Sequence, residues 1–154
     1  MRKLAIAIDG PAGAGKSSVA KILAANMGYA YLDTGAMYRA VTYEVLRREL
    51  TEEKDIVALA AGMDMTVKPE ADAMHVVVNG HDVTDYIRTP EVSARVSAVS
   101  ALAGVRAAMV GIQRRQAAKG GIVLDGRDIG TTVLPHACLL YTSDAADDMQ
   151  CGDL

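Results

Sequence analysis

Apolar and polar positions along the chain predict strands that alternate with helices. Short apolar runs, each suited to a buried strand, occur at residues 4–8, 29–32, 122–124 and 138–141. Helices are expected over about 36–48, 51–62 and 103–119, where apolar residues recur at helical spacing. This order is typical of an α/β fold, a parallel sheet flanked by helices.

Two further helices have clear boundary signals. Val19, Ile22, Leu23 and Met27 fall at helical spacing after the first strand, and Gly28 can end that helix. The run Thr89-Pro90-Glu91 supplies a cap, a proline at the first helical position and an acid in the first turn. A helix is therefore expected from residue 90 onward.

A small β-meander interrupts this α/β pattern. Residues 65–67 and 75–78 are predicted strands, and Asn79-Gly80 is a strong two-residue hairpin signal. We expect an insertion over about residues 64–88. His75 and His81 flank the hairpin and could suggest a metal site, but no third ligand is evident and exposed hairpin histidines are commoner.

Composition limits the classes of function. The chain has 154 residues, 51% hydrophobic and 23% charged, which suits one globular domain with a core. A net charge of −3 argues against a duplex nucleic-acid partner, which needs a dense cationic surface. No segment is long enough to span a membrane, and the two cysteines form no ligand or disulfide pattern. A cytoplasmic location is expected.

Residues 10–17 read GPAGAGKS and fit the phosphate-binding loop G-x-x-x-x-G-K-[ST]. The glycines let backbone N–H groups turn toward anionic oxygens, Lys16 can reach the outer phosphates, and the Ser17 hydroxyl can ligate Mg²⁺. The residues assigned to this nucleotide site are Gly10, Pro11, Ala12, Gly13, Ala14, Gly15, Lys16, Ser17 and Ser18. The alternative is a glycine-rich turn with a chance Lys-Ser, which the flanking strand and helix disfavour.

Charged residues near element ends are further candidates. Arg39 lies near a helix start, where the helix dipole disfavours a positive charge. Either an anionic ligand offsets this unfavourable interaction, or Arg39 is a solvated surface arginine. Asp125 closes a buried strand and is well placed to hold Mg²⁺ directly or through water. Arg127 and Asp128 follow, as part of a ligand crevice or as a surface turn with a local ion pair.

The segments GPAGAGKS, LDTGAMYRAV, VVVNGHDVTDYIRTPEVS, QRRQ and LDGRDIGT, in this order, resemble bacterial-type cytidylate kinase over residues 4 to about 140. The ordered set is far more specific than any single motif. The resemblance implies a P-loop kinase fold in which the meander closes over a nucleoside monophosphate. It implies transfer of the γ-phosphoryl group of ATP to CMP or dCMP, with Mg²⁺, by a monomer.

The resemblance also implies roles for particular residues. Lys16, Arg39 and Arg127 would be catalytic, with the two arginines on the CMP phosphate. Ser97, Arg106 and Asp128 would face the cytosine edge, with Thr34 nearby. Cytosine offers an amino donor to a carboxylate and acceptors to an arginine or serine. Ser17 and Asp125 are the expected metal ligands, and the transfer would be direct and in line.

The motifs that carry the resemblance end at about residue 140. We expect residues 1–141 to form the kinase core and residues 142–154, which read TSDAADDMQCGDL with four aspartates, to form an acidic tail. The family continues with an arginine-rich lid and a last strand and helix. Without them, little kinase activity and a tendency to aggregate are expected.

Three other interpretations stay open. One is a kinase of the same architecture with another small acceptor, which DTGAMYR and DGRDIGT weigh against. A second is a nucleotide-dependent switch, although an N-K-x-D motif is absent. The third is a nucleotide-binding fragment without catalytic activity.

Overall fold

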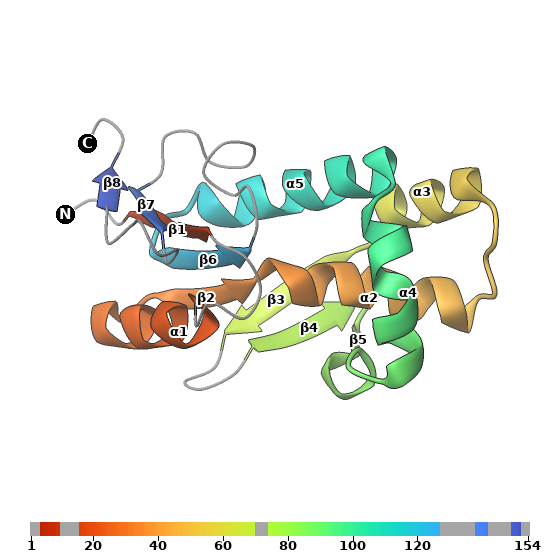
Figure 1. The fold of residues 1–154 in the computed structure, drawn as a ribbon, viewed down its shortest axis with the longest axis horizontal. Helices are drawn as coiled ribbons and strands as arrows, with labels where there is room; N and C mark the ends of the chain where they lie inside the picture. Colours follow the sequence, from red (N-terminus) through yellow and green to blue (C-terminus); the bar gives the residue numbers. More distant parts are fainter. Residues whose placement is uncertain (1–3, 10–15, 70–73, 127–137, 142–148, 152–154) are drawn as a thin grey trace. The chain divides into compact units, whose positions relative to one another are not determined.

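The computed structural model describes residues 4–9, 16–69, 74–126, 138–141 and 149–151 (Figure 1). The chain divides into two compact units. Unit 1 comprises Met1–Thr34, Pro69–Ala73 and Gln113–Leu154, and unit 2 comprises Gly35–Lys68 and Met74–Ile112. Each unit is described by itself.

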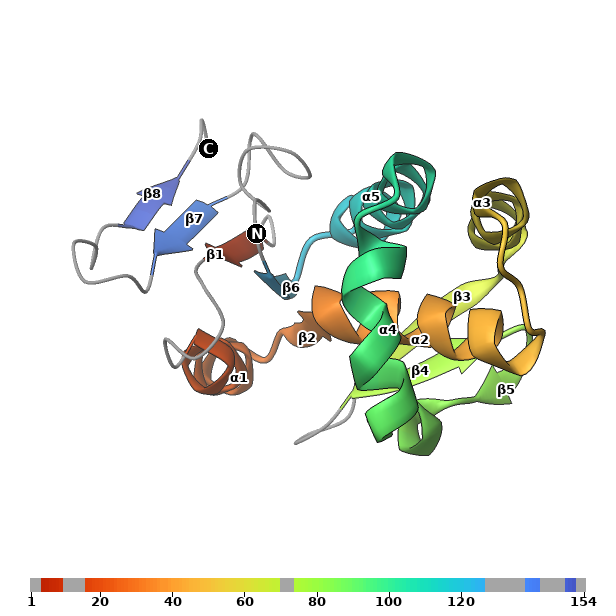
Figure 2. The same ribbon diagram turned by 45° about the vertical axis from the view of Figure 1, so that its right-hand side comes forward.

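Unit 1 contains a five-stranded sheet with the order β2-β6-β1-β7-β8. The strands are β1 (Ala5–Asp9), β2 (Ala30–Asp33), β6 (Ile122–Gly126), β7 (Cys138–Tyr141) and β8 (Met149–Cys151). The first four run parallel, and β8 pairs antiparallel with β7 at the edge (Figure 2). The predicted parallel sheet is confirmed, whereas the sequence predicted no element where β8 lies.

Helix α1 (Lys16–Met27) packs on one face of this sheet. Ala20, Ala24 and the partly buried Leu23 contact the strand residues Ile6, Ile8 and Val123. Alanine has no side chain beyond Cβ, so the helix can approach the strands closely. Burial of each aliphatic strand residue contributes about 1.5 to 3 kcal/mol.

The predicted apolar face of α1 is partly wrong. Val19, Ile22 and Met27 are 41%, 61% and 39% exposed. The buried stripe instead follows Ala20, Leu23 and Ala24, which lie three and four positions apart. The helix ends as predicted at Gly28, whose φ of 67° favours glycine.

Unit 2 surrounds a three-stranded sheet with the order β3-β4-β5. These strands are β3 (Met65–Pro69), β4 (Met74–Val78) and β5 (His81–Asp82). Asn79 and Gly80 have φ values of 49° and 85°, so the predicted two-residue hairpin is confirmed. The unit also holds α3 (Glu53–Gly62), η1 (Thr84–Tyr86) and α4 (Pro90–Ser100), together with most of α2 (Thr34–Arg47) and of α5 (Ala103–Ala117).

Helix α4 begins as its sequence predicts. Pro90 is its first residue, and the Thr89 side-chain oxygen accepts a hydrogen bond of 3.4 Å from the Val92 N–H. Within the described residues, no single helix is long and apolar enough to cross a membrane. Helices α4 and α5 pass that test of length and composition only as a pair, and they meet at a bend of 97°.

The polar groups of the hairpin bind one another. His75 Nδ1 lies 2.8 Å from Asp82 Oδ2, and Thr84 donates its hydroxyl and N–H to Asp82 Oδ1 at 2.6 and 3.0 Å. The two Thr84 bonds, followed by the one with His75, lower the pKa of Asp82 to about 2. Among the described residues no group of three or more histidine, cysteine or acidic side chains could hold a metal. These contacts favour a structural role for His75.

Gly104, in the first turn of α5, lies against Val57 of α3. A Cβ at position 104 would lie 2.8 Å from Val57 Cγ2, 3.2 Å from its Cβ and closer still to Cγ1. Overpacking of this kind costs about 1 to 3 kcal/mol. Replacing a helical glycine with alanine recovers only about 1 kcal/mol. We therefore expect Gly104→Ala to lower the free energy of unfolding by about 1 kcal/mol in a urea titration.

The matched test is the same substitution in a Val57→Ala background. There both Cγ contacts are absent and only the 3.2 Å approach to the Cβ of residue 57 remains, so Gly104→Ala should become close to neutral or stabilising. Equal destabilisation in both backgrounds would mean that Val57 is not the cause.

Candidate functional site

The predicted phosphate loop lies between β1, which ends at Asp9, and α1, which begins at Lys16. Strand, glycine-rich loop and helix therefore follow in the order that the motif requires. Gly10, Pro11, Ala12, Gly13, Ala14 and Gly15 lie outside the described residues. Lys16, Ser17 and Ser18 are the first three residues of α1. The first N–H groups of a helix have no intrahelical partner, so such a helix start can bind anions.

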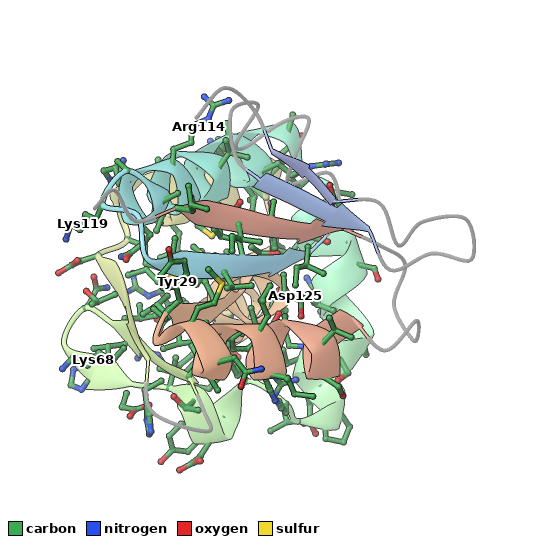
Figure 3. The ribbon with its side chains drawn as sticks, turned by 90° about the vertical axis from the view of Figure 1, so that its left-hand side faces the viewer. Tyr29, Lys68, Arg114, Lys119 and Asp125 are labelled. Carbon is green, nitrogen blue, oxygen red and sulfur yellow. The ribbon has the colours of Figure 1, made fainter. Side chains whose placement is uncertain are left out.

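Asp125 lies on β6, next to the strand that enters the loop. In the parallel register Asp125 is opposite Ile8 of β1 and Asp33 of β2. Figure 3 shows Asp125 and Tyr29 at opposite ends of the parallel strands, so Asp125 is at the carboxyl ends. Asp125 is only 1% exposed. Ligands of parallel α/β sheets bind at this edge, so the buried Asp125 carboxylate lies where a ligand is expected.

Neighbouring residues of unit 1 hold Asp125 in place. The Tyr31 hydroxyl donates a hydrogen bond of 2.9 Å to Asp125 Oδ2. The Thr34 hydroxyl donates one of 2.9 Å to the Asp125 carbonyl oxygen. This bond joins Thr34, the first residue of α2, to β6. Helix α2 begins directly after β2, without a turn between them. Lys21 of α1 places its Nζ 5.7 Å from the centre of the Tyr31 ring, which is within cation–π range.

Neither Tyr31 nor Lys21 was predicted as a site residue from the sequence. A weak signal existed, because Tyr31 precedes Asp33 by two positions and so shares its face of a strand. That face includes Asp125 only because β2 pairs with β6. This pairing joins residues 94 positions apart, and local periodicity does not reveal it.

The Tyr31–Asp125 bond leads to a stability prediction. Tyr31→Phe removes a donor from a buried carboxylate, and hydrogen bonds to charged groups are worth about 1.5 to 3 kcal/mol. Tyr29→Phe is the matched control, because among the described residues the Tyr29 oxygen accepts the Leu4 N–H alone, at 3.0 Å. That neutral bond is worth about 0.5 to 1.5 kcal/mol. Urea titration should show the larger loss for Tyr31→Phe, and equal losses would contradict a charge-assisted bond.

Three of the predicted acceptor-side residues fall together in unit 2. Arg39 lies on α2, Ser97 on α4 and Arg106 on α5. Arg39 Nη1 donates hydrogen bonds to the Ile87 carbonyl at 3.2 Å and to Ser93 Oγ at 2.9 Å. Ser97 follows Ser93 by one helical turn, so the two serines share a face of α4.

Arg106 lies near Tyr38, the residue that precedes Arg39. Burial raises the pKa of the Tyr38 hydroxyl, and the positive charge of Arg106 acts in the opposite direction. Arg106 is itself exposed. Arg127 and Asp128, two further predicted acceptor-side residues, lie outside the described part of the chain.

The residues present fit a magnesium ion bound together with a nucleotide. Mg²⁺ is usually held by one or two carboxylates plus substrate phosphates, with several waters kept. Asp125 supplies such a carboxylate, and Tyr31 and Thr34 restrict its position. Ser17, at the start of α1, supplies a hydroxyl by sequence. A dedicated cluster of protein ligands is not needed for this mode of binding.

Known proteins provide an independent comparison. Residues 6–149 match the family model for cytidylate kinase. The cytidylate kinase of Desulfitobacterium hafniense strain Y51 is 51% identical over 140 residues, which cover 90% of this chain and 60% of that protein. That of Bacillus licheniformis is 53% identical over 140 residues, covering 88% and 62%. That of Bacillus subtilis strain 168 is 51% identical over 138 residues, covering 88% and 62%.

The chain spans about 60% of the length of the curated relatives that it matches. The match includes the phosphate loop, the Arg39 helix, the hairpin and the strand that carries Asp125. The chain therefore belongs to the cytidylate kinase family.

Proposed function

We propose that this protein transfers the γ-phosphoryl group of ATP to CMP or dCMP, with ADP and CDP or dCDP as products. The observation that carries the proposal is the junction of β1 and α1 around the sequence GPAGAGKS, with Asp125 on the adjacent strand β6. This arrangement supports binding of a nucleotide with its metal. The likeness to cytidylate kinases supports a cytidine monophosphate as the acceptor.

On the donor side, the loop from Gly10 to Ser18 holds the ATP phosphates. Lys16 neutralises charge on the outer phosphates, and Ser17 and Asp125 hold Mg²⁺. When bound, this ion neutralises phosphate charge during transfer. The Tyr31 hydroxyl and the Thr34 hydroxyl keep Asp125 at the strand end before the nucleotide arrives.

On the acceptor side, Arg39 and Arg127 bind the phosphate of CMP. Ser97, Arg106 and Asp128 contact the cytosine edge, with Thr34 nearby. A carboxylate accepts from the cytosine amino group, while arginine and serine donate to its carbonyl and ring nitrogen. Ser93 and Ser97 share a face of α4, and Arg39 is bonded to Ser93. This supports a site in which the phosphate lies near Arg39 and the cytosine edge near Ser97.

Catalysis in this proposal is positioning and charge neutralisation. The acceptor phosphate attacks the γ-phosphorus in line, and no covalent enzyme intermediate forms. Lys16, Arg39 and Arg127 stabilise the charge on the moving group. One chain carries both the phosphate loop and the acceptor residues, which supports a monomeric enzyme. A cytoplasmic location fits the use of ATP and CMP.

The test is a coupled assay of ADP release with ATP, Mg²⁺ and a panel of CMP, dCMP, UMP and AMP. Stimulation is expected with CMP or dCMP and not with AMP, and its rate relative to that of a full-length cytidylate kinase tests the expectation of little kinase activity. Stimulation by a different acceptor would replace the proposed substrate, and ADP release without any acceptor would favour a nucleotide-hydrolysing switch. Calorimetry with CMP separates the last case, because a phosphate-loop switch has no site for CMP. CMP binding without turnover would favour a non-catalytic binding protein.

A further inference from the structure

Both hydrogen bonds of the Arg39 guanidinium within the described part of the chain start from one nitrogen. Nη1 carries two hydrogens, and its two acceptors are the Ile87 carbonyl at 3.2 Å and Ser93 Oγ at 2.9 Å. A guanidinium has five N–H donors in a fixed plane. The other three belong to Nε and Nη2, which form one edge of that plane. Two parallel donors on such an edge match two oxygens of a phosphate.

We infer that Ser93 is a positioning residue for Arg39. The Ser93 hydroxyl and the Ile87 carbonyl accept both hydrogens of Arg39 Nη1, so that the Nε–Nη2 edge of the guanidinium binds the acceptor phosphate. The inference rests on the proposed function. It adds to it a residue that the sequence did not single out and that has no contact with the substrate of its own.

The two acceptors are themselves held in place. Ile87 is 1% exposed and follows Tyr86, whose ring stacks on that of Tyr43 with centroids 5.7 Å apart and planes at 22°. Tyr43 lies one helical turn after Arg39 on α2. The Ile87 carbonyl is therefore fixed relative to the helix that carries the arginine.

Ser93 is fixed by the start of α4. Its N–H donates to the Thr89 carbonyl at 3.0 Å, and the Thr89 side chain and Pro90 define the first turn. The serine hydroxyl is thus an acceptor on a rigid element. A free arginine side chain loses considerable rotamer freedom when it binds a ligand. An arginine that is already bonded at Nη1 loses less, and this favours phosphate binding.

The test uses variants that differ in the hydroxyl at position 93. Ser93→Thr keeps it, Ser93→Val has nearly the shape of threonine without it, and Ser93→Ala removes it with the least added bulk. Calorimetry with CMP should give Kd values about tenfold weaker for the valine and alanine variants, as expected for loss of one hydrogen bond to a charged group. The threonine variant should bind within about twofold of the parent.

Cytidine provides the readout that a merely structural role would not produce. It lacks the phosphate, so its affinity should be the same in the parent and all three variants. Ser100→Ala is the matched control on the same helix, because within the part of the chain that the structure describes the Ser100 hydroxyl donates to one backbone carbonyl, that of Ser97, at 3.2 Å. It should leave the affinities for CMP and cytidine unchanged. In an Arg39→Met background, Ser93→Ala should have no further effect.

Several results would overturn the inference. Parental CMP affinity in Ser93→Val and Ser93→Ala would do so, as would equal losses for CMP and cytidine. An additive loss in the Arg39→Met background would mean that Ser93 acts independently of the arginine. If the parent binds CMP, any of these results removes only the role of Ser93. A parent that fails to bind CMP removes the proposed function as well.

Discussion

Replacing Asp125 with asparagine should remove most of the effect of Mg²⁺ on ATP binding. Asparagine has the same shape and can still accept the hydrogen bond that Tyr31 donates at 2.9 Å. It lacks the negative charge that a hard cation requires. The loss of an outer-shell partner alone lowers metal affinity by about 10- to 100-fold, so the loss of Asp125 should cost at least this much whether it holds Mg²⁺ directly or through water. Calorimetric titration with ATP, with and without Mg²⁺, measures this difference.

Two controls make the Asp125→Asn result specific. Metal-free ATP should bind the variant at least as tightly as the parent, because one negative charge near the phosphates is gone. Asp33→Asn removes another carboxylate from the same edge, directly opposite Asp125 in the register. It should leave the Mg²⁺ effect largely intact. If Asp33→Asn abolishes the effect and Asp125→Asn does not, the metal ligand has been assigned to the wrong strand.

The elements of the fold could be predicted because local sequence patterns determine them. Apolar runs such as residues 122–124 are too short for a helix and therefore predict strands, and β6 begins at Ile122 as expected. Asn79-Gly80 adopts the positive φ angles that make it a hairpin signal. The Thr89-Pro90 cap likewise starts α4 where predicted. In each case the residues that specify the element lie within it.

The packing of these elements was less predictable. The apolar spacing of α1 suggested Val19, Ile22 and Met27, yet alanines form much of its buried face. Alanine contributes little to an apolar pattern, but a helix that lies close to a sheet needs small residues at the contact. Which face of a helix is buried thus depends on its neighbour as well as on its own sequence.

The support around the candidate site also depends on long-range pairing. Tyr31 reaches Asp125 because β2 lies beside β6, and Arg39 reaches Ser93 because α2 packs near the start of α4. These pairs are separated by 94 and 54 positions, too far for any periodicity to relate them. The residues predicted to contact substrate came from motifs and a family likeness. The residues that hold them required the structure.

Arg39 allows the sharpest test of the acceptor side, because lysine and methionine variants separate charge from geometry. Arg39→Met should weaken CMP binding by about 30- to 150-fold, which corresponds to about 2 to 3 kcal/mol, the lower part of the range for a lost charged partner. That part of the range applies because Arg39 is partly exposed. Arg39→Lys should recover only a small share of this loss. An ammonium has no planar fork, and it cannot bond Ile87, Ser93 and a phosphate in one fixed geometry.

The comparison requires a control for simple loss of positive charge. Arg95→Met removes an exposed arginine from α4, and we expect a change in CMP affinity of less than about twofold at physiological salt, where screening weakens distant charges. ATP affinity in the absence of CMP should be unchanged in all these variants, since the residues assigned to ATP, the phosphate loop and Asp125, include neither position 39 nor position 95. Parental CMP affinity in Arg39→Lys would mean that charge alone suffices at this position. The bonds to Ile87 and Ser93 would then stabilise unit 2 without orienting the arginine for a phosphate.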